Sequence, residues 1–177
     1  MADRKLLNSE LGRINAEQYR RKPESGIALI LDNIRSAHNI GSAFRTADSF
    51  GADFIALCGI CAAPPSAEIH KSALGAEESV KWEHFDDTHA AVAMLKEKGY
   101  TIISVEQTEH AVQLQDFRRP ERCAFIFGNE VDGVQQDVVD ESDLCLEIPQ
   151  FGTKHSLNVS VSVGVVLWQA VSKGPGQ

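Results

Sequence analysis

The sequence lacks the long apolar segments that mark membrane and secreted proteins. No apolar run in its 177 residues is long enough to span a bilayer. The N-terminus, Met1-Ala2-Asp3-Arg4-Lys5, carries no apolar stretch of the kind found in signal peptides. These absences predict a cytoplasmic protein that does not bind a membrane.

The common nucleotide-binding fingerprints are also missing. No G-x-G-x-x-G pattern follows the first apolar strand pattern, and no G-x-x-x-x-G-K-[ST] loop occurs anywhere. Both absences disfavour an NAD-dependent enzyme or an NTPase. They leave open an α/β enzyme that binds nucleotides in another way.

Cysteine is scarce and does not form a metal-binding pattern. Two of the four cysteines form Cys58-Gly59-Ile60-Cys61, but a zinc site needs four ligands and no second close pair exists. Pro64-Pro65 places this pair in a loop, whereas redox pairs usually stand at a helix start. Cys123 and Cys145 lie in apolar strand patterns, so we expect both to be buried. We predict no metal, with a redox role for Cys58 and Cys61 as the alternative.

Positive charge is in short supply and unevenly placed. The net charge is −8, which argues against generic binding of nucleic acid. Residues 1–22 hold six Lys and Arg against three Asp and Glu, a net +3, which leaves −11 on the remainder. This basic arm could meet a phosphate backbone locally, although an ordinary solvated helix is the simpler interpretation.

Short apolar runs alternate with helical patterns along the whole chain. Leu7, Leu11 and Ile14 have the spacing of an amphipathic helix, which we expect over about 3–20. We expect strands near 27–31, 53–57, 100–105, 123–127 and 144–148, and helices near 39–50, 66–73, 88–98, 134–139 and 156–172. This alternation predicts an α/β fold in one domain over 1–177, with a mostly parallel sheet and helices on both faces.

Polar motifs stand at the junctions where apolar patterns give way to loops or helices. They are Asn39-x-Gly41-x-x-x-Arg45, Gly128-Asn129-Glu130-x-x-Gly133 and Ser156-Leu157-Asn158-Val159-Ser160. Ligands bind outside the carboxyl ends of the strands in open parallel sheets. We therefore expect one composite ligand site, although Gly128 and Gly133 alone would also suit a simple tight turn.

These motifs, in this order and at these separations, resemble the SpoU/TrmH class of SPOUT RNA methyltransferases. The resemblance runs from about Ile27 to Trp168, with smaller matches at Leu74-Gly75-Ala76 and Val105-Glu106-Gln107-Thr108. It implies an α/β fold with a deep C-terminal trefoil knot, which pattern reasoning alone would not suggest. It also implies S-adenosylmethionine as cofactor, a ribose 2′-OH of tRNA or rRNA as methyl acceptor, and a homodimer with sites at the subunit interface.

By this resemblance, the cofactor contacts Val105, Gly128, Ile148 and Leu157, largely through backbone groups. Apolar residues suit that role because their N–H and C=O groups can still meet an adenine. Without the resemblance, core packing would be the default interpretation for Ile148 and Leu157.

The resemblance assigns catalysis to Arg45, Asn39, Glu130, Ser156 and Asn158. A guanidinium is effectively never deprotonated, so Arg45 suits an RNA phosphate clamp or a ribose orienter better than a base. Asn39 and Asn158 could fix Arg45 and the ribose, and Glu130 could orient Arg45 or its loop. Simpler roles are an ion pair at a turn for Glu130 and a helix cap for Ser156.

Two further expectations concern the proton and the RNA. His155 precedes the last motif and could accept the hydroxyl proton, although a solvated loop histidine is the simpler interpretation. RNA capture would depend on the N-terminal helix, the Arg118-Arg119…Arg122 patch, Lys154 and the dimer partner. A catalytically inactive RNA-binding or ribosome-assembly module of the same fold is the alternative function.

Overall fold

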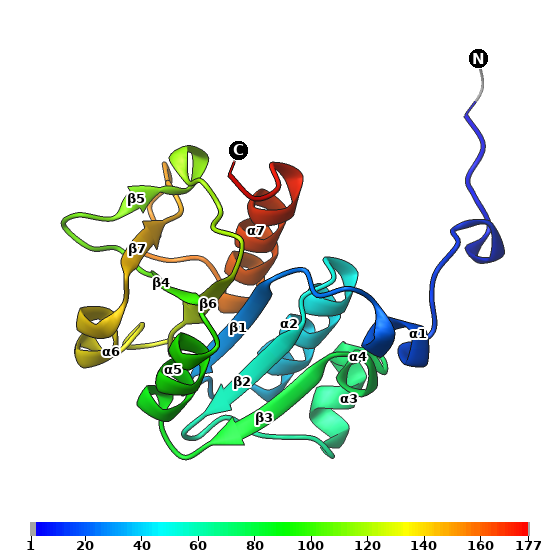
Figure 1. Cartoon of the computed structure of the whole chain (residues 1–177), viewed down its shortest axis with the longest axis horizontal. Helices are drawn as coiled ribbons and strands as arrows, with labels where there is room; N and C mark the ends of the chain where they lie inside the picture. Colours follow the sequence, from blue (N-terminus) through cyan, green and yellow to red (C-terminus); the bar gives the residue numbers. More distant parts are fainter. Residues whose placement is uncertain (1–2, 177) are drawn as a thin grey trace.

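The computed structural model describes residues 3–176, which form a parallel sheet between two layers of helices (Figure 1). The strands are β1 (Ile27–Asp32), β2 (Phe54–Cys58), β3 (Lys81–Phe85), β4 (Thr101–Val105), β5 (Val112–Gln113), β6 (Cys123–Phe127) and β7 (Leu144–Glu147). The helices are α1 (Ala16–Arg21), α2 (Ala37–Ser49), α3 (Ala67–Ala73), α4 (Ala76–Ser79), α5 (Thr88–Glu97), α6 (Gln136–Glu141) and α7 (Val159–Ser172). Two 3-10 turns are η1 (Asn8–Glu10) and η2 (Leu114–Asp116).

All neighbouring strands are parallel, in the order β3-β2-β1-β6-β4-β7-β5. The predicted mostly parallel sheet with helices on both faces is therefore confirmed. After β1 the chain adds β2 and β3 on one side of that strand. The later strands β4, β5, β6 and β7 all lie on its other side, with β6 next to β1. Such a reversal in a parallel sheet opens a crevice at the carboxyl ends of the strands.

The alternation of side chains along β1 explains why the whole strand is apolar. Ile27, Leu29 and Leu31 face the core shared with α2 and α7, while Ala28 and Ile30 face the core shared with α5 and α6. Every residue of β1 is buried, as expected for a parallel strand that is covered on both sides.

The predicted N-terminal helix over 3–20 is wrong in its extent, because only Ala16–Arg21 is α-helical. Gly12 has a φ of +61°, which interrupts the helix. Asn15 then starts α1, and its side chain accepts a hydrogen bond from the N–H of Gln18. Of the residues before α1, those from 3 to 15 extend away from the sheet, as Figure 1 shows. The apolar side chains that suggested a longer helix are exposed: Leu7, Leu11 and Ile14.

Other differences from the predicted elements have simple causes. The sequence reasoning missed β3 because its residues, Lys-Trp-Glu-His-Phe, form an edge strand without an apolar run. It placed the start of α7 near residue 156, but the helix begins at Val159 and Asn158 is its cap. A cap role for Ser156 is therefore wrong. No helix within residues 3–176 has both the length and the apolar character needed to cross a bilayer.

Candidate active site

A cavity of about 530 Å³ opens at the carboxyl ends of β4, β6 and β7. Small-molecule sites commonly enclose roughly 300–1,000 Å³, so the cavity has the size of a cofactor site. All four residues predicted to contact the cofactor line it: Val105, Gly128, Ile148 and Leu157. Glu130, Ser156 and Asn158, from the predicted catalytic set, also lie on its wall.

The loop after β6 folds back on itself at the cavity. Asn129 and Gly133 exchange backbone hydrogen bonds of 2.9 Å in both directions, and Gly133 has a φ of +71°. A Cβ atom on Gly128 would collide with the backbone of Gly133 and Val134. Both glycines are therefore required by the loop itself, which brings backbone close to any ligand in the cavity.

Glu106 fixes this loop from the end of β4. One carboxylate oxygen accepts the backbone N–H of Val134 at 3.0 Å, and the other accepts that of Gln107 at 2.9 Å. Gln107 in turn donates its side-chain amide to the carbonyl of His155 at 2.7 Å. Through Glu106 and Gln107, the end of β4 thus connects the loop of the second motif to the loop that precedes the third motif.

Asn39 joins the three motifs through its side chain. Its amide nitrogen donates to Oε1 of Glu130 at 2.9 Å, and its Oδ1 accepts from Nδ2 of Asn158 at 3.3 Å. Asn158 also accepts hydrogen bonds from the backbone and hydroxyl of Ser160 at 2.9 and 2.6 Å. In the sequence, Asn39 lies 91 positions from Glu130 and 119 positions from Asn158. The side chains of these three residues nevertheless form one continuous series of hydrogen bonds, which we call the polar chain.

The Glu130 carboxylate accepts hydrogen bonds from three N–H donors. Its oxygens take the backbone N–H groups of Arg35 at 3.0 Å and Ser36 at 3.2 Å, besides the amide of Asn39. Partial burial alone would raise the pKa of Glu130, but these donors outweigh it and hold the pKa below its ordinary value. The carboxylate is therefore charged at neutral pH and is a poor proton acceptor.

Arg45 stands apart from this polar chain. It is exposed on α2, on the side away from the buried Ile40, Phe44 and Ala47, as the helical spacing predicted. Within residues 3–176 its guanidinium makes no hydrogen bond or ion pair, and it does not line the cavity. The structure therefore brings Asn39, Glu130 and Asn158 together but leaves Arg45 outside their contacts.

The sequence reasoning missed Asp32, the polar residue at the end of β1. This carboxylate is fully buried and accepts hydrogen bonds from Thr88 at 2.5 Å, from the side chain of Asn33 at 2.9 Å and from the side chain of Gln135 at 3.1 Å. Asn129 donates to the carbonyl of Asn33 at 2.7 Å. These contacts tie the loop after β1, which leads to the first motif, to the loop of the second motif. The sequence feature that could have revealed Asp32 is an acidic residue at the end of an apolar strand pattern.

Gly41 has a packing role instead of a place in the cavity. A Cβ atom there would collide with the backbone and side chains of α3, at Ile69 and Ser72. The glycine of the first motif thus allows α2 and α3 to pack closely.

The cysteines are buried thiols with little thiolate character. Burial raises the pKa of Cys58 to about 12 and that of Cys61 to about 11. Cys61 accepts the N–H of Ile34 and donates to the carbonyl of Leu31, both at 3.2 Å. These features disfavour redox chemistry at this pair. Cys123 is buried as predicted, whereas Cys145 is only partly covered. Residues 3–176 contain no group of three or more His, Cys, Asp or Glu placed to hold a metal ion.

The predicted basic patch at 118–122 is divided by the structure. Arg118 is exposed, but Arg119 is only 7% exposed and donates to the carbonyl of Ser25 at 3.0 Å. Arg119 therefore serves the fold, and a surface role for it is wrong. Lys154 is exposed on the loop before α7.

The chain is thus a parallel α/β protein with a cavity of small-molecule size at the carboxyl ends of its strands. Residues 26–168 match the SpoU rRNA Methylase family, and the chain belongs to that family. It is 35% identical over 144 residues to the 23S rRNA (guanosine-2′-O-)-methyltransferase RlmB of Neisseria meningitidis, covering 81% of this chain and 57% of the relative. It is 28% identical over 165 residues to the tRNA (guanosine(18)-2′-O)-methyltransferase of Thermus thermophilus, covering 92% and 82%.

Solved structures share this fold. The A. aeolicus TrmH/SpoU tRNA modifying enzyme superposes with a TM-score of 0.78 at 23% identity, covering 89% of this chain and 81% of the other. AviRb from Streptomyces viridochromogenes, in complex with AdoMet, has a TM-score of 0.78 at 22% identity, covering 88% and 63%. The chain thus spans only part of several relatives, including 57% of the length of the Neisseria protein.

Proposed function

We propose that this chain is an S-adenosylmethionine-dependent methyltransferase that acts on a ribose 2′-OH of tRNA or rRNA. The observation that carries the proposal is the cavity at the ends of β4, β6 and β7, beside the hydrogen-bonded Glu130, Asn39 and Asn158. Relatives named as guanosine-2′-O-methyltransferases support it. An inactive RNA-binding module is not favoured, because it would have no need for this intact polar chain. The proposed RNA substrates agree with the cytoplasmic location predicted from the sequence.

The residues around the cavity fit the cofactor. Val105, Ile148 and Leu157 offer apolar surface and backbone groups, and Gly128 lets backbone approach the ligand. The named complex of AviRb with AdoMet supports the same choice of cofactor. When bound, S-adenosylmethionine supplies an electrophilic methyl group.

The chain's own residues would orient the acceptor hydroxyl. A ribose 2′-OH is a weak nucleophile, so its oxygen must be held in line with the methyl group. Glu130 holds Asn39 in one orientation, and Asn39 in turn holds Asn158 on the cavity wall at the start of α7. Ser156 lies exposed on the cavity wall, where its hydroxyl can contact substrate. Arg45, exposed and unpaired within residues 3–176, suits a phosphate clamp.

His155 is the candidate for receiving the hydroxyl proton. It is exposed at the cavity and its backbone is held by Gln107, whereas Glu130 is poorly suited because its pKa is lowered. His155→Asn should lower turnover and preserve cofactor binding. Unchanged turnover across the pH range would exclude His155 as the base.

A homodimer with a C-terminal trefoil knot completes the proposal. Val161, Val165 and Trp168 leave an apolar stripe exposed on α7, by 50%, 37% and 61%, and such stripes commonly form interfaces. Because α7 starts at Asn158 on the cavity wall and packs against α2, which carries Arg45, a second copy covering this stripe would lie next to both helices. Sedimentation of the wild type and of Trp168→Lys tests the dimer, which the variant should weaken; a wild-type monomer would contradict it. A crystal structure with a continuous chain trace tests the knot.

The activity is tested with total RNA from a strain that lacks this gene and with S-adenosylmethionine carrying a labelled methyl group. We expect the label in one RNA species and, after nuclease mapping, at one nucleotide. Cofactor binding without transfer to any RNA would favour the inactive module. Labelling of RNA from the parent strain should be weak, because its sites are already methylated.

A further inference from the structure

A second cavity, of about 150 Å³, opens at the opposite, amino end of the sheet. Residues at the starts of β2 and β3, and residues that precede β4 and β6, contribute to its wall. The remaining wall comes from α1 and the segment that follows it, from Ser79 at the end of α4, and from Leu95 of α5 with Lys98 just after that helix. We call this cavity the amino-end cleft. It is distinct from the candidate active site, because the two share no lining residue.

The amino-end cleft concentrates positive charge in an acidic protein. Its charged lining residues are Arg20, Lys22, Lys81, Lys98 and Arg122 on the basic side, and Glu24 and Asp53 on the acidic side. The cleft therefore carries a net +3, while the whole chain carries −8. The basic residues come from four separate places in the chain, since only Arg20 and Lys22 are near each other in the sequence, so folding assembles this charge.

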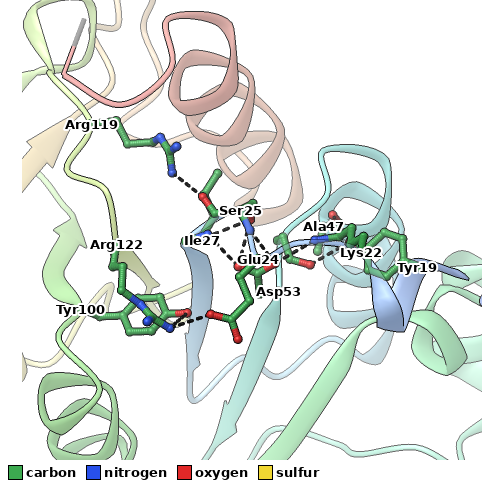
Figure 2. A network of polar contacts seen from close by, with 12 residues as sticks. Tyr19, Lys22, Glu24, Ser25, Ile27, Ala47, Asp53, Tyr100, Arg119 and Arg122 are labelled. Carbon is green, nitrogen blue, oxygen red and sulfur yellow. Dashed lines mark hydrogen bonds and ion pairs between the residues drawn. The ribbon is translucent and has the colours of Figure 1, made fainter. Parts of the chain in front are cut away.

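Some of these charged side chains hold the wall of the cleft together, so they are not free to bind a ligand. Lys22 pairs with Asp53 at 2.8 Å, and Asp53 also accepts the backbone N–H groups of Ser25 and Gly26 at 3.0 and 2.7 Å. Figure 2 shows this network around Asp53. It fixes the segment between α1 and β1 against the start of β2.

Arg122 is fixed in a similar way. It pairs with Glu24 at 2.9 Å, and its guanidinium lies 4.7 Å from the centroid of the Tyr100 ring (Figure 2). Both carboxylates of the cleft are therefore already paired. Arg20 donates to the carbonyl of Glu78, which attaches α1 to the end of α4.

Three cations of the cleft have no counter-ion. Within residues 3–176, Arg20, Lys81 and Lys98 form no ion pair, and all three are exposed. The ammonium of Lys98 lies 5.9 Å from the ring centroid of Phe54, which turns it toward the cleft wall. An anion entering the cleft would meet these charges on a framework whose own carboxylates are neutralised.

We propose that the amino-end cleft binds a phosphate of the RNA backbone, at a position remote from the methylated ribose. This inference rests on the proposed function and names where the RNA is held. Lys and Arg contacts to phosphate supply sequence-independent affinity and position the RNA. Strands of five residues at about 3.3 Å per residue separate the two ends of the sheet by roughly 15 Å, a distance that a folded RNA spans.

The test compares two lysine pairs in the full chain, with a tRNA transcript that carries no modified nucleotides. Lys81→Gln/Lys98→Gln removes two cleft cations that hold no other part of the fold by a hydrogen bond or ion pair within residues 3–176. The control, Lys96→Gln/Lys173→Gln, removes two exposed lysines outside the cleft, which bond the carbonyls of Glu141 and Gln115.

The readout is the dependence of RNA affinity on salt. For the cleft variant we expect affinity near 0.1 M salt to fall on the order of tenfold, and the slope of log K against log salt to decrease by about 1.4–1.8. The control should keep the wild-type slope, and both variants should bind S-adenosylmethionine normally. Equal changes in the two variants, or no change in either, would overturn the inference. Wild-type chain that binds RNA but transfers no methyl group would instead contradict the proposed function and leave the cleft intact.

Discussion

The two ends of the sheet are built from different kinds of contact. At the carboxyl end, loops are held to one another by uncharged amides and by carboxylates that accept N–H groups, around a cavity lined by both polar and apolar residues. At the amino end, ion pairs and an Arg–Tyr stack surround a smaller cleft with excess positive charge. The contacts at the carboxyl end fix the loop backbone around a cavity that suits a small ligand. The contacts at the amino end leave unpaired cations that can bind a large anion.

Gly128→Ala should give the largest effect and confine it to the carboxyl end. The added Cβ would collide with the backbone of Gly133 and Val134, and such overpacking costs about 1–3 kcal/mol of stability. Because the displaced loop lines the cavity, we expect the affinity for S-adenosylmethionine, measured by calorimetry, to fall on the order of tenfold, which corresponds to about 1.4 kcal/mol of binding free energy. Gly152→Ala is the control, since a Cβ atom there meets no atom within 4 Å. Full affinity in Gly128→Ala would show that this loop does not contact the cofactor.

Tyr19→Phe should give an intermediate effect at the amino end. The buried hydroxyl of Tyr19 donates to the carbonyl of Ala52 at 2.7 Å and lies 3.2 Å from that of Ala47 (Figure 2). Leaving these acceptors unpaired costs about 1–2 kcal/mol, which urea unfolding measures. Cofactor affinity should not change, because no element of the first cavity is touched.

The other tyrosine provides the control for that experiment. Tyr100→Phe removes only a weak 3.4 Å contact from Arg122, which keeps its pair with Glu24. We expect a smaller loss of stability than in Tyr19→Phe. A loss of cofactor affinity in either variant would mean that the two ends of the sheet are coupled.

Glu130→Gln should have the smallest effect on stability, and one that depends on pH. The pKa of Glu130 in the folded protein lies below its ordinary value of 4.5. The charged side chain therefore contributes its full share of the folding stability above that pH, and this share is lost as the pH falls through the folded-state pKa. We expect the variant to be less stable by about 1 kcal/mol at neutral pH, with the difference shrinking below about pH 4.5.

Urea unfolding at several pH values measures this difference. Glu109→Gln is the control, because Glu109 is exposed and its side chain forms no hydrogen bond within the described residues. A difference that grows as the pH falls would contradict the assigned contacts of Glu130.

The comparison of the two ends also shows what the sequence could predict. Apolar runs such as β1 and β6 and the polar junctions after them were visible, because burial on both faces demands continuous apolar residues and ligand loops demand Gly and Asn. The amino-end cleft was not visible as a unit, since Lys81 and Lys98 are ordinary surface lysines until folding places them beside Arg20.

The same limit explains the individual errors. A helical spacing of Leu7, Leu11 and Ile14 could not reveal that these side chains have no surface to pack against. The sequence suggested that Arg119, which lies between Arg118 and Arg122, is exposed. In the structure it is buried and donates to the carbonyl of Ser25. Gly41 belonged to a ligand motif but serves helix packing. Each of these depends on tertiary neighbours that local patterns do not contain.

Steady-state methyl transfer to RNA tests the division between the two ends most directly, with Asn39→Ala and Lys81→Gln/Lys98→Gln compared with the wild type. Asn39→Ala should lower kcat at least about tenfold with little change in KM for RNA, because it releases Asn158 and Glu130, the cavity-lining residues that Asn39 holds in place. The lysine variant should raise KM for RNA at an unchanged kcat, because its contacts are the same in the ground and transition states. A lowered kcat in the lysine variant, or a change confined to KM in Asn39→Ala, would contradict the account.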